Sequence, residues 1–264
     1  MNLPALLPPF AGSAVACRRP GGGRLFLFDS LPSTNRWALE HAAELRHGDA
    51  VRAIRQTAGR GRFERVWLSP GDRGLALTLL LCPPRRADWL AERSGFAAAL
   101  AVRDVLAAFG LPARVKWPND VVVRGRKIAG ILAERADPAG PVALGIGLNV
   151  NLTRTDFRGT KLMQPATSMR LEAGHAFEIA AVCERLRRAF ALRWRRLQAQ
   201  GPQGIRRAWA RHDFLKGKIV TVQGPSNSAV GSYAGMDDDG RLILRIGRES
   251  RLFWSGDVSV APES

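Results

Sequence analysis

The sequence has few cysteines, few lysines and no long hydrophobic segment. Its three cysteines, Cys17, Cys82 and Cys183, stand far apart, without CxxC spacing or a nearby histidine cluster. This pattern predicts reduced core thiols and argues against a disulfide framework or a metal site. No run of eighteen apolar residues occurs, and the first residues make a poor signal peptide. We therefore expect a soluble, cytoplasmic protein that does not associate with a membrane.

Positive charge greatly exceeds negative charge, yet lysine supplies little of it. The chain has 40 lysines and arginines against 23 acidic residues, a net charge of +17, and only five of the basic residues are lysines. Such a charge is typical of nucleic-acid-binding proteins. The arginines are nevertheless scattered through predicted helices and loops alike, so we attribute most of the excess to solvated faces. A chain of 264 residues with 46% hydrophobic content is long enough for a substantial core.

The hydrophobic pattern predicts an α/β fold with a mixed sheet, followed by a small β module. Strands or hairpins are expected at 24–28, 50–56, 74–81, 115–134 and 142–150, and Gly145 and Gly147 indicate a close approach to the backbone of the last one. A helix with an apolar face from Trp37 to Leu45 is expected after the first strand. Long helices are expected at 87–109 and 177–197, the second ended by a break at Gly201-Pro202. From Lys218 onward the pattern changes to short strands separated by turns. We therefore expect a loose Pro/Gly-rich lead-in at 1–23, an α/β domain at 24–212 and a small β domain at 213–264.

The segment from Gln56 to Pro70 has the composition of an anion-binding loop. Three arginines and two glycines fall within the seven positions from Gly59 to Arg65. Glycines let backbone N–H groups approach an anion, and arginines present planar forks that match carboxylate or phosphate oxygens. Composition alone fits a solvated basic loop equally well, so the neighbouring signals have to decide between the two interpretations.

Further polar residues stand at predicted strand ends or in the adjoining turns. A mixed sheet commonly presents a ligand site at such positions. Uncharged hydrogen-bonding groups, several cations and one carboxylate suit a ligand with a polar head, an acidic tail and a phosphate. Ser33, Thr34 and Asn35 also fit the N-cap of a helix. The pattern predicts an anion-activating or nucleotide-using enzyme. These residues are Ser33, Thr34, Asn35, Gln56, Lys116, Asn119, Asp120, Lys127 and Asn149.

Several strings resemble the motifs of the biotin protein ligases, the biotin–[acetyl-CoA-carboxylase] ligases. The resemblance extends in order over about residues 24 to 260. It implies a catalytic α/β domain related to lipoate ligases and class II aminoacyl-tRNA synthetases, followed by an SH3-like β-barrel. The strings are Ser33-Thr-Asn35, Gly59-Arg-Gly-Arg62 with Arg65, Trp67 and Ser69-Pro70, Lys116-Trp-Pro-Asn-Asp120, Lys127-Ile-Ala-Gly-Ile-Leu132 and Gly145-Ile-Gly-Leu-Asn149-Val.

The resemblance implies an enzyme that uses ATP, biotin and Mg²⁺. Biotin would be activated to biotinyl-5'-AMP and transferred to a lysine of a biotin carboxyl carrier domain of acetyl-CoA carboxylase or a related carboxylase. About two dozen residues precede the first predicted strand, too few for the winged helix-turn-helix of bifunctional members, so we expect no specific DNA binding. Whether the chain forms a homodimer stays open. The alternatives are a lipoate or octanoate ligase on the same fold and a non-enzymatic, basic nucleic-acid-binding protein.

The matching positions also imply roles for individual residues. Arg60, Arg62, Lys127 and Asp120 would be catalytic, and Asp120 would bind Mg²⁺ or orient the acceptor lysine. Biotin would be bound by Ser33, Thr34, Asn35, Gln56, Arg60, Gly61, Arg62 and Lys127, with Arg60 and Arg62 near its carboxyl tail and the phosphate. The nucleotide would be bound by Arg62, Arg65, Trp67, Lys116, Asn119, Lys127 and Asn149.

Two loops carry further expectations. The loop around Arg60 is expected to order over the ligand, and the segment from Asn151 to about Thr167 to close over the nucleotide. One departure from the family pattern is visible after Ser69-Pro70, where Gly71-Asp72-Arg73-Gly74 replaces the usual glycine. The geometry of that turn is therefore not predicted by the resemblance.

Overall fold

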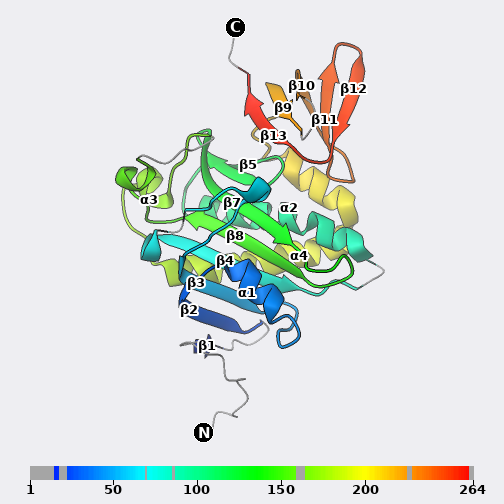
Figure 1. Ribbon diagram of the computed structural model, residues 1–264. Coiled ribbons are helices and arrows are strands. Elements are labelled where there is room, and N and C mark those ends of the chain that lie inside the picture. Colours follow the sequence, from blue (N-terminus) through cyan, green and yellow to red (C-terminus); the bar gives the residue numbers. More distant parts are fainter. Residues whose placement is uncertain are drawn as a thin grey trace.

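The computed structural model describes residues 15–17, 23–68, 70–84, 87–158, 164–224 and 228–261. Most of the predicted lead-in, Ser69 and residues 159–163 of the segment predicted to close over the nucleotide lie outside the described residues. The described chain forms an eight-stranded mixed sheet and a separate five-stranded antiparallel sheet. Two long helices pack on one face of the large sheet and a short helix on the other (Figure 1). The predicted α/β fold with a small β domain is confirmed.

The large sheet has the strand order β1-β2-β3-β4-β8-β7-β6-β5. Its neighbours pair antiparallel except β2 and β3, which pair parallel. The first strand falls inside the segment expected to be a loose lead-in, so that expectation was wrong for these three residues. The strands are β1 (Val15–Cys17), β2 (Leu25–Leu31), β3 (Ala50–Gln56), β4 (Gly74–Leu81), β5 (Ala113–Lys116), β6 (Asp120–Val123), β7 (Arg126–Glu134) and β8 (Val142–Asn149).

Alternation along the central strands separates a packed face from a site face. In β4, Leu75, Leu77 and Leu79 belong to the main hydrophobic core formed with helices α2 (Asp88–Ala108) and α4 (Ile179–Ala210). Because successive side chains of a strand point to opposite faces, Thr78 lies on the other side, against helix α1 (Thr34–Glu40). In β8 the same alternation leaves Gly145, Gly147 and Asn149 on the α1 side. The site face of the sheet thus carries small and polar residues.

The helices follow the predicted pattern with two differences. Helix α1 has Ser33 at its N-cap and ends at Glu40, earlier than the apolar pattern through Leu45 indicates. Helix α3 (Met169–Ala173) has no predicted counterpart. Helix α4 kinks at Gly201, whose φ is 64°, directly before Pro202, which confirms the predicted break. None of the helices in the described ranges is long and apolar enough to cross a membrane.

The prediction of three buried cysteines was wrong for one of the two that the structure describes. Cys183 on α4 is buried, and burial raises the pKa of its thiol to about 11. Cys82, directly after β4, is exposed, because the strand's apolar run ends one residue before it. Both thiols are free. The side chain of Cys17 lies outside the described residues.

The small β domain docks on the large domain beside Trp117. The indole Nε1 of Trp117 donates to the carbonyl of Gly240 at 2.9 Å, and Arg93 on α2 donates to the carbonyl of Asp238, also at 2.9 Å. Figure 1 shows this domain above the β5 end of the large sheet. The predicted boundary at 212/213 stays a prediction. The strand order is β12-β11-β10-β9-β13, for β9 (Ile219–Gln223), β10 (Ser228–Met236), β11 (Leu242–Ile246), β12 (Glu249–Phe253) and β13 (Asp257–Val260).

Gly240 allows a test of this docking contact. Its φ is +83°, and a Cβ placed on it would lie 2.6 Å from Cε2 of Phe96, whose ring is held edge-on by Trp209. Gly247 has a φ of +61° and nothing within 4 Å of such a Cβ, so it is a matched control. Both alanine variants incur backbone strain. Because of overpacking against Phe96, we expect the free energy of unfolding to fall by about 1–3 kcal/mol more in Gly240→Ala than in Gly247→Ala. Urea unfolding midpoints measure the difference, and equal losses would contradict the docking geometry.

Candidate functional site

One cavity of about 1040 Å³ gathers all fourteen residues that the sequence predicts for the site. The α1-side face of the large sheet forms its floor. The segment from Gly59 to Trp67, called the pocket loop below, covers part of it, and residues 256–260 of the small β domain contribute to its wall. The cavity therefore lies between the two domains, with residues from both lining it.

Glycines on the floor let larger side chains lie directly against the sheet. A Cβ on Gly145 would lie 2.6 Å from Oδ1 of Asn35, and one on Gly147 only 2.3 Å from Cε2 of Trp67. Gly130, on the neighbouring strand β7, would bring a Cβ to 3.1 Å from Cζ3 of Trp67. The sequence expectation of a close approach to β8 is confirmed. Asn35 and Trp67 are the side chains that make this approach.

The end of the cavity next to α1 is lined by uncharged hydrogen-bonding groups. Gln56, the last residue of β3, accepts from the backbone N–H of Thr34 at 2.8 Å and from its hydroxyl at 3.1 Å. The hydroxyl of buried Thr78 lies 2.8 Å from that of Thr34 and 2.6 Å from Oδ1 of Asn35. Ser33 completes this end and also caps α1. Both roles considered for Ser33 from the sequence are therefore compatible.

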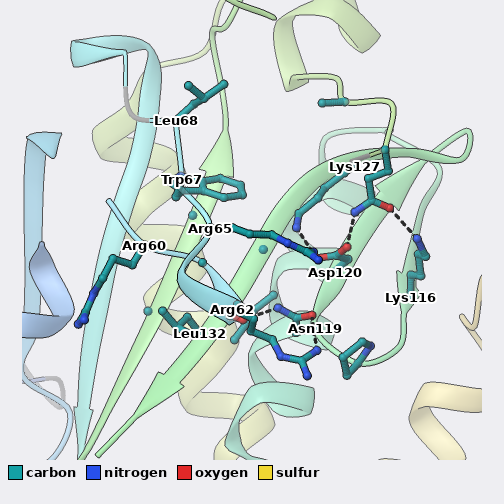
Figure 2. A pocket seen from close by; sticks show the side chains of 18 of the residues that line it. Arg60, Arg62, Arg65, Trp67, Leu68, Lys116, Asn119, Asp120, Lys127 and Leu132 are labelled. Carbon is teal, nitrogen blue, oxygen red and sulfur yellow. Dashed lines mark hydrogen bonds and ion pairs between the residues drawn. The ribbon is translucent and has the colours of Figure 1, made fainter. Parts of the chain in front are cut away.

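Arg60 does not join the other cations of the site. Its guanidinium forms an ion pair with Glu134, at 2.9 Å, at the end of β7. The second carboxylate oxygen of Glu134 accepts from Nδ2 of Asn35 at 2.7 Å. Figure 2 shows Arg60 pointing away from the group around Lys127 and Asp120. The sequence placed Arg60 beside Arg62, near a carboxyl tail and a phosphate, whereas the structure separates the two side chains.

The opposite end of the cavity carries two lysines joined through a carboxylate and an amide. Lys127 Nζ lies 2.6 Å from Oδ1 of Asp120, and Lys116 Nζ donates to Gln164 at 2.6 Å. The amide of Gln164 donates to the second oxygen of Asp120, which closes the chain (Figure 2). Burial lowers the pKa of the Lys116 ammonium, and Asp120 acts in the opposite direction. Two ammonium groups, of which only Lys127 is paired directly with a carboxylate, leave this end cationic and suited to an anion.

Two arginines of the pocket loop extend this cationic end. Arg62 donates to Oδ1 of Asn119 at 3.4 Å, and burial lowers the pKa of its guanidinium. Arg65 forms a two-pronged ion pair with Asp257 of the small β domain, with one N–O distance of 2.9 Å. This hydrogen bond holds the pKa of Asp257 below its ordinary value and raises that of Arg65. The pocket loop is thereby fastened to β13.

Backbone bonds give the pocket loop a defined shape. Gly61 N–H donates to the carbonyl of Arg65 at 2.7 Å, and Trp67 N–H donates to that of Gly59 at 2.9 Å. Phe63 sits at the tip with a φ of 54° and is half exposed. The turn that the resemblance did not predict forms a short 3₁₀ helix, η2 (Gly71–Arg73).

Asn149, the last residue of β8, also lines the cavity. Its side-chain amide donates to the carbonyl of Thr167 at 2.9 Å.

Four site residues have no counterpart in the sequence prediction. Thr78 had a usable signal, because it is the one polar residue in the apolar run of β4. Glu134 ends an amphipathic strand, and its role depends on which face of β7 meets the loop. Gln164 lies in the segment that was expected to close over the nucleotide, although the sequence did not single it out. Asp257 reaches the site through domain docking, for which local sequence gives no signal.

The magnesium role considered for Asp120 does not fit the geometry. Both of its carboxylate oxygens are engaged, one by Lys127 and one by Gln164. Among the residues placed in the structure, no group of three or more His, Cys, Asp or Glu side chains could hold a metal ion. Mg²⁺ is commonly held by one or two carboxylates together with substrate phosphates. Any such ion here would therefore depend on the ligand for most of its coordination.

Comparisons with known proteins find similar sequences among the biotin protein ligases. The family model described as "Biotin/lipoate A/B protein ligase family" matches residues 27–151. The biotin–[acetyl-CoA-carboxylase] ligase of Paracoccus denitrificans is 39% identical over 220 residues, which are 81% of this chain and 90% of that protein. The bifunctional ligase/repressor BirA of Bacillus subtilis is 32% identical over 243 residues, or 90% of this chain and 74% of that protein.

A solved structure shows the same fold. The biotin protein ligase from Aquifex aeolicus in complex with biotin and ATP has a TM-score of 0.79 to this chain and is 24% identical. The match covers 90% of this chain and 99% of that one. The similarity therefore extends beyond the large domain into the small β domain.

The glycine floor leads to a testable consequence for the pocket loop. In Gly147→Ala the new methyl group would overlap the Trp67 indole, so the loop must lift from the sheet. Overpacking of this kind costs about 1–3 kcal/mol, and we expect the loop amides of Gly61 and Trp67 to exchange with deuterium about 5- to 100-fold faster. Gly74→Ala is the control, since its Cβ would make only ordinary contacts, with Leu152 Cδ1 at 3.7 Å and the carbonyl oxygen of Leu148 at 3.8 Å. The same exchange rates in both variants would contradict the proposed packing.

Proposed function

Because the chain belongs to the biotin protein ligases of the biotin/lipoate A/B protein ligase family, we propose that it activates biotin with ATP and biotinylates a carrier protein. The observation that carries the proposal is the division of one cavity into an uncharged hydrogen-bonding end and a cationic end. Biotin has a neutral ureido head and a carboxylate tail, and ATP adds phosphates. Biotin and ATP together therefore match both ends of the cavity, the ureido head at the uncharged end and the carboxylate and phosphates at the cationic end.

The uncharged end is where we place the ureido head. Thr34, Gln56 and Ser33 offer hydroxyl and amide groups at fixed positions, and the network through Thr78 keeps them oriented. A site built to hydrogen-bond a polar head rejects analogues that lack it, because its buried polar groups would then lose their partners. This end provides the specificity for biotin over other acyl acids.

In the first step, a carboxylate oxygen of biotin attacks the α-phosphorus of ATP, and pyrophosphate leaves. The two reactants are anions, so their approach must be offset by fixed positive charge. We place Lys127 and Arg62 on the biotin carboxylate and the α-phosphate, and Lys116 and Arg65 toward the remaining phosphates. Because Asp120 holds Lys127 in position beforehand, little reorganisation is needed when the substrates bind.

The nucleotide base is placed at the Asn149 end of the cavity. Asn149 is buried and already fixed by its bond to Thr167, so its amide is preoriented to read an adenine edge. Trp67 lies flat over the floor glycines and supplies an aromatic wall, while Asn119 steadies Arg62. Mg²⁺ enters as the counterion of the ATP phosphates and belongs to that substrate.

In the second step, the amine of an acceptor lysine attacks the acyl carbon of biotinyl-5'-AMP. The C–O bond to the phosphate breaks, AMP leaves as the anion, and the amine loses a proton. We propose that Asp120, which lies beside Lys127 in the cavity, orients the incoming amine and receives this proton. The pocket loop keeps water from the mixed anhydride.

The acceptor that follows from the family is a carrier protein with a biotin-accepting lysine. The absence of specific DNA binding stays a prediction from the sequence, and whether the chain forms a homodimer stays open. The direct test is to incubate the protein with biotin, MgATP and a carrier domain and to probe the carrier for linked biotin. Absence of both transfer and biotin-dependent pyrophosphate exchange would refute the proposal, and salt-dependent duplex binding in their place would favour the basic nucleic-acid-binding alternative.

Removal of one cation tests the electrostatic argument. Loss of a preorganised transition-state donor typically costs about 100- to 1000-fold in rate. We expect Lys127→Ala to reduce biotin-dependent pyrophosphate exchange by that factor, because Lys127 faces both anions. Lys216→Ala is the matched control, since Lys216 is exposed and does not line the cavity. A loss below tenfold in Lys127→Ala would show that the lysine does not serve this step.

Removal of a hydroxyl at the uncharged end tests substrate choice. In Thr34→Val the hydroxyl is lost while the shape is kept. Gln56 retains the backbone N–H of Thr34 as a donor, but the ureido head that we place here loses one hydrogen-bonding partner, which costs about 1–3 kcal/mol. We expect the KM for biotin to rise about 5- to 100-fold, with no gain for lipoate, whose ring lacks a ureido group. Thr221→Val, on strand β9 outside the cavity, is the control. Activity with lipoate or octanoate that exceeds activity with biotin in the unmodified protein would support the alternative ligase function.

A further inference from the structure

A continuous chain of polar contacts connects the two ends of the segment that enters the pocket loop. It starts at Gln56, which accepts from Thr34, and passes through Thr78 to Asn35. Asn35 then donates to Glu134, whose other oxygen pairs with Arg60. Gln56 and Arg60 are four residues apart in the sequence. The contacts therefore close a ring around the entry of the loop.

Glu134 is the member of this ring that holds two elements at once. One carboxylate oxygen lies 2.7 Å from the Asn35 amide, and the other lies 2.9 Å from the Arg60 guanidinium. The Glu134 side chain is 23% exposed and that of Arg60 is 47% exposed, so the pair is accessible to water only in part. No other carboxylate forms an ion pair with Arg60 among the described residues. The position of the Arg60 guanidinium at the end of β7 thus depends on its ion pair with Glu134.

Glu134 also fixes which way the Asn35 amide faces. Nδ2 of Asn35 donates to Glu134 and to the carbonyl of Leu132 at 3.1 Å, while Oδ1 receives the Thr78 hydroxyl at 2.6 Å. Both amide hydrogens of Asn35 are therefore used within the protein, and its oxygen accepts from Thr78. The flipped orientation would set the amide oxygen against two acceptors. Asn35 is in this way a structural link between the uncharged end and the loop.

We propose that Glu134 is a positioning residue which holds the pocket loop over the cavity through Arg60 and keeps the uncharged end in register through Asn35. The inference rests on the proposed function for its enzymatic readout and deepens the description of the same site. It also assigns Arg60 to loop docking, where a contact with the substrate carboxylate or phosphate was expected. Arg60 points away from the Lys127–Asp120 group, in agreement with this assignment (Figure 2).

The proposal separates substrate retention from chemistry. A loop that docks less firmly lets biotin leave faster, so affinity for biotin falls. The groups on the reacting atoms, Lys127 and Arg62, keep their own partners Asp120 and Asn119 and are not changed. Loss of the Arg60–Glu134 pair should therefore affect the dissociation constant for biotin more than the turnover at saturating biotin.

The experiment is a double-mutant cycle of Arg60→Ala and Glu134→Gln. Glutamine keeps an acceptor for Asn35 but removes the charge that pairs with Arg60. Each single variant is expected to weaken biotin binding about fivefold, the upper end for a partly exposed ion pair, and the double variant to weaken it no further. Glu40→Gln, which removes the exposed pair of Glu40 with Arg36 outside the cavity, is the matched control and should leave binding unchanged.

A ligand-free measurement keeps this inference distinguishable from the proposed function. Deuterium exchange at the Gly61 and Trp67 amides should accelerate to the same extent in Arg60→Ala, Glu134→Gln and the double variant, with or without any activity toward biotin. Multiplicative losses of affinity, of about 25-fold in the double variant, would overturn the proposal. So would a fall in turnover for Arg60→Ala that exceeds its loss of affinity, because Arg60 would then act on the substrate itself. Failure of the unmodified protein to bind biotin would refute only the proposed function.

Discussion

The site depends on how closely side chains can approach the backbone of β7 and β8. Gly130, Gly145 and Gly147 expose bare backbone on the face of the sheet where Asn35 and Trp67 lie. Any Cβ at these places would displace the groups that shape the cavity, whereas the opposite face of the same strands packs apolar side chains against α2 and α4. Because successive side chains of a strand point to opposite faces, each of these strands packs apolar side chains against α2 and α4 on one face and leaves its backbone accessible on the other.

Above that floor, the distribution of charge follows from a few fixed partners. Carboxylates hold cations at three places: Asp120 beside Lys127, Glu134 beside Arg60 and Asp257 beside Arg65. The cations that line the cavity are thereby oriented before any ligand arrives. Elsewhere many of the chain's arginines are exposed, as along α4, and others are paired with carboxylates, as Arg193 is with Asp104. The net charge of +17 therefore gives little information about the site itself.

The sequence predicts the parts of the site that have local signatures. Strand-end residues such as Gln56 and Asn149, the glycines of β8 and the arginine-rich loop could all be located from composition and period. Direction could not be predicted, and Arg60 shows why: the same guanidinium could face a substrate or Glu134, and only the register of β7 decides. The contribution of Asp257 depends on domain docking through Trp117 and Gly240, which is a long-range contact without a local pattern.

The cavity wall contributed by β13 gives the small domain a share in ligand affinity. Gln223 and residues 256–260 line the same space as the sheet floor, so a molecule bound there contacts both domains together. By thermodynamic linkage, a change that stabilises the contact between the two domains also increases the affinity for the ligand. Bound ligand in turn increases the free energy needed to separate the domains by an equal amount. The two domains act as one cooperative unit when the cavity is filled, and substitutions in the small domain can alter substrate affinity without touching the reacting atoms.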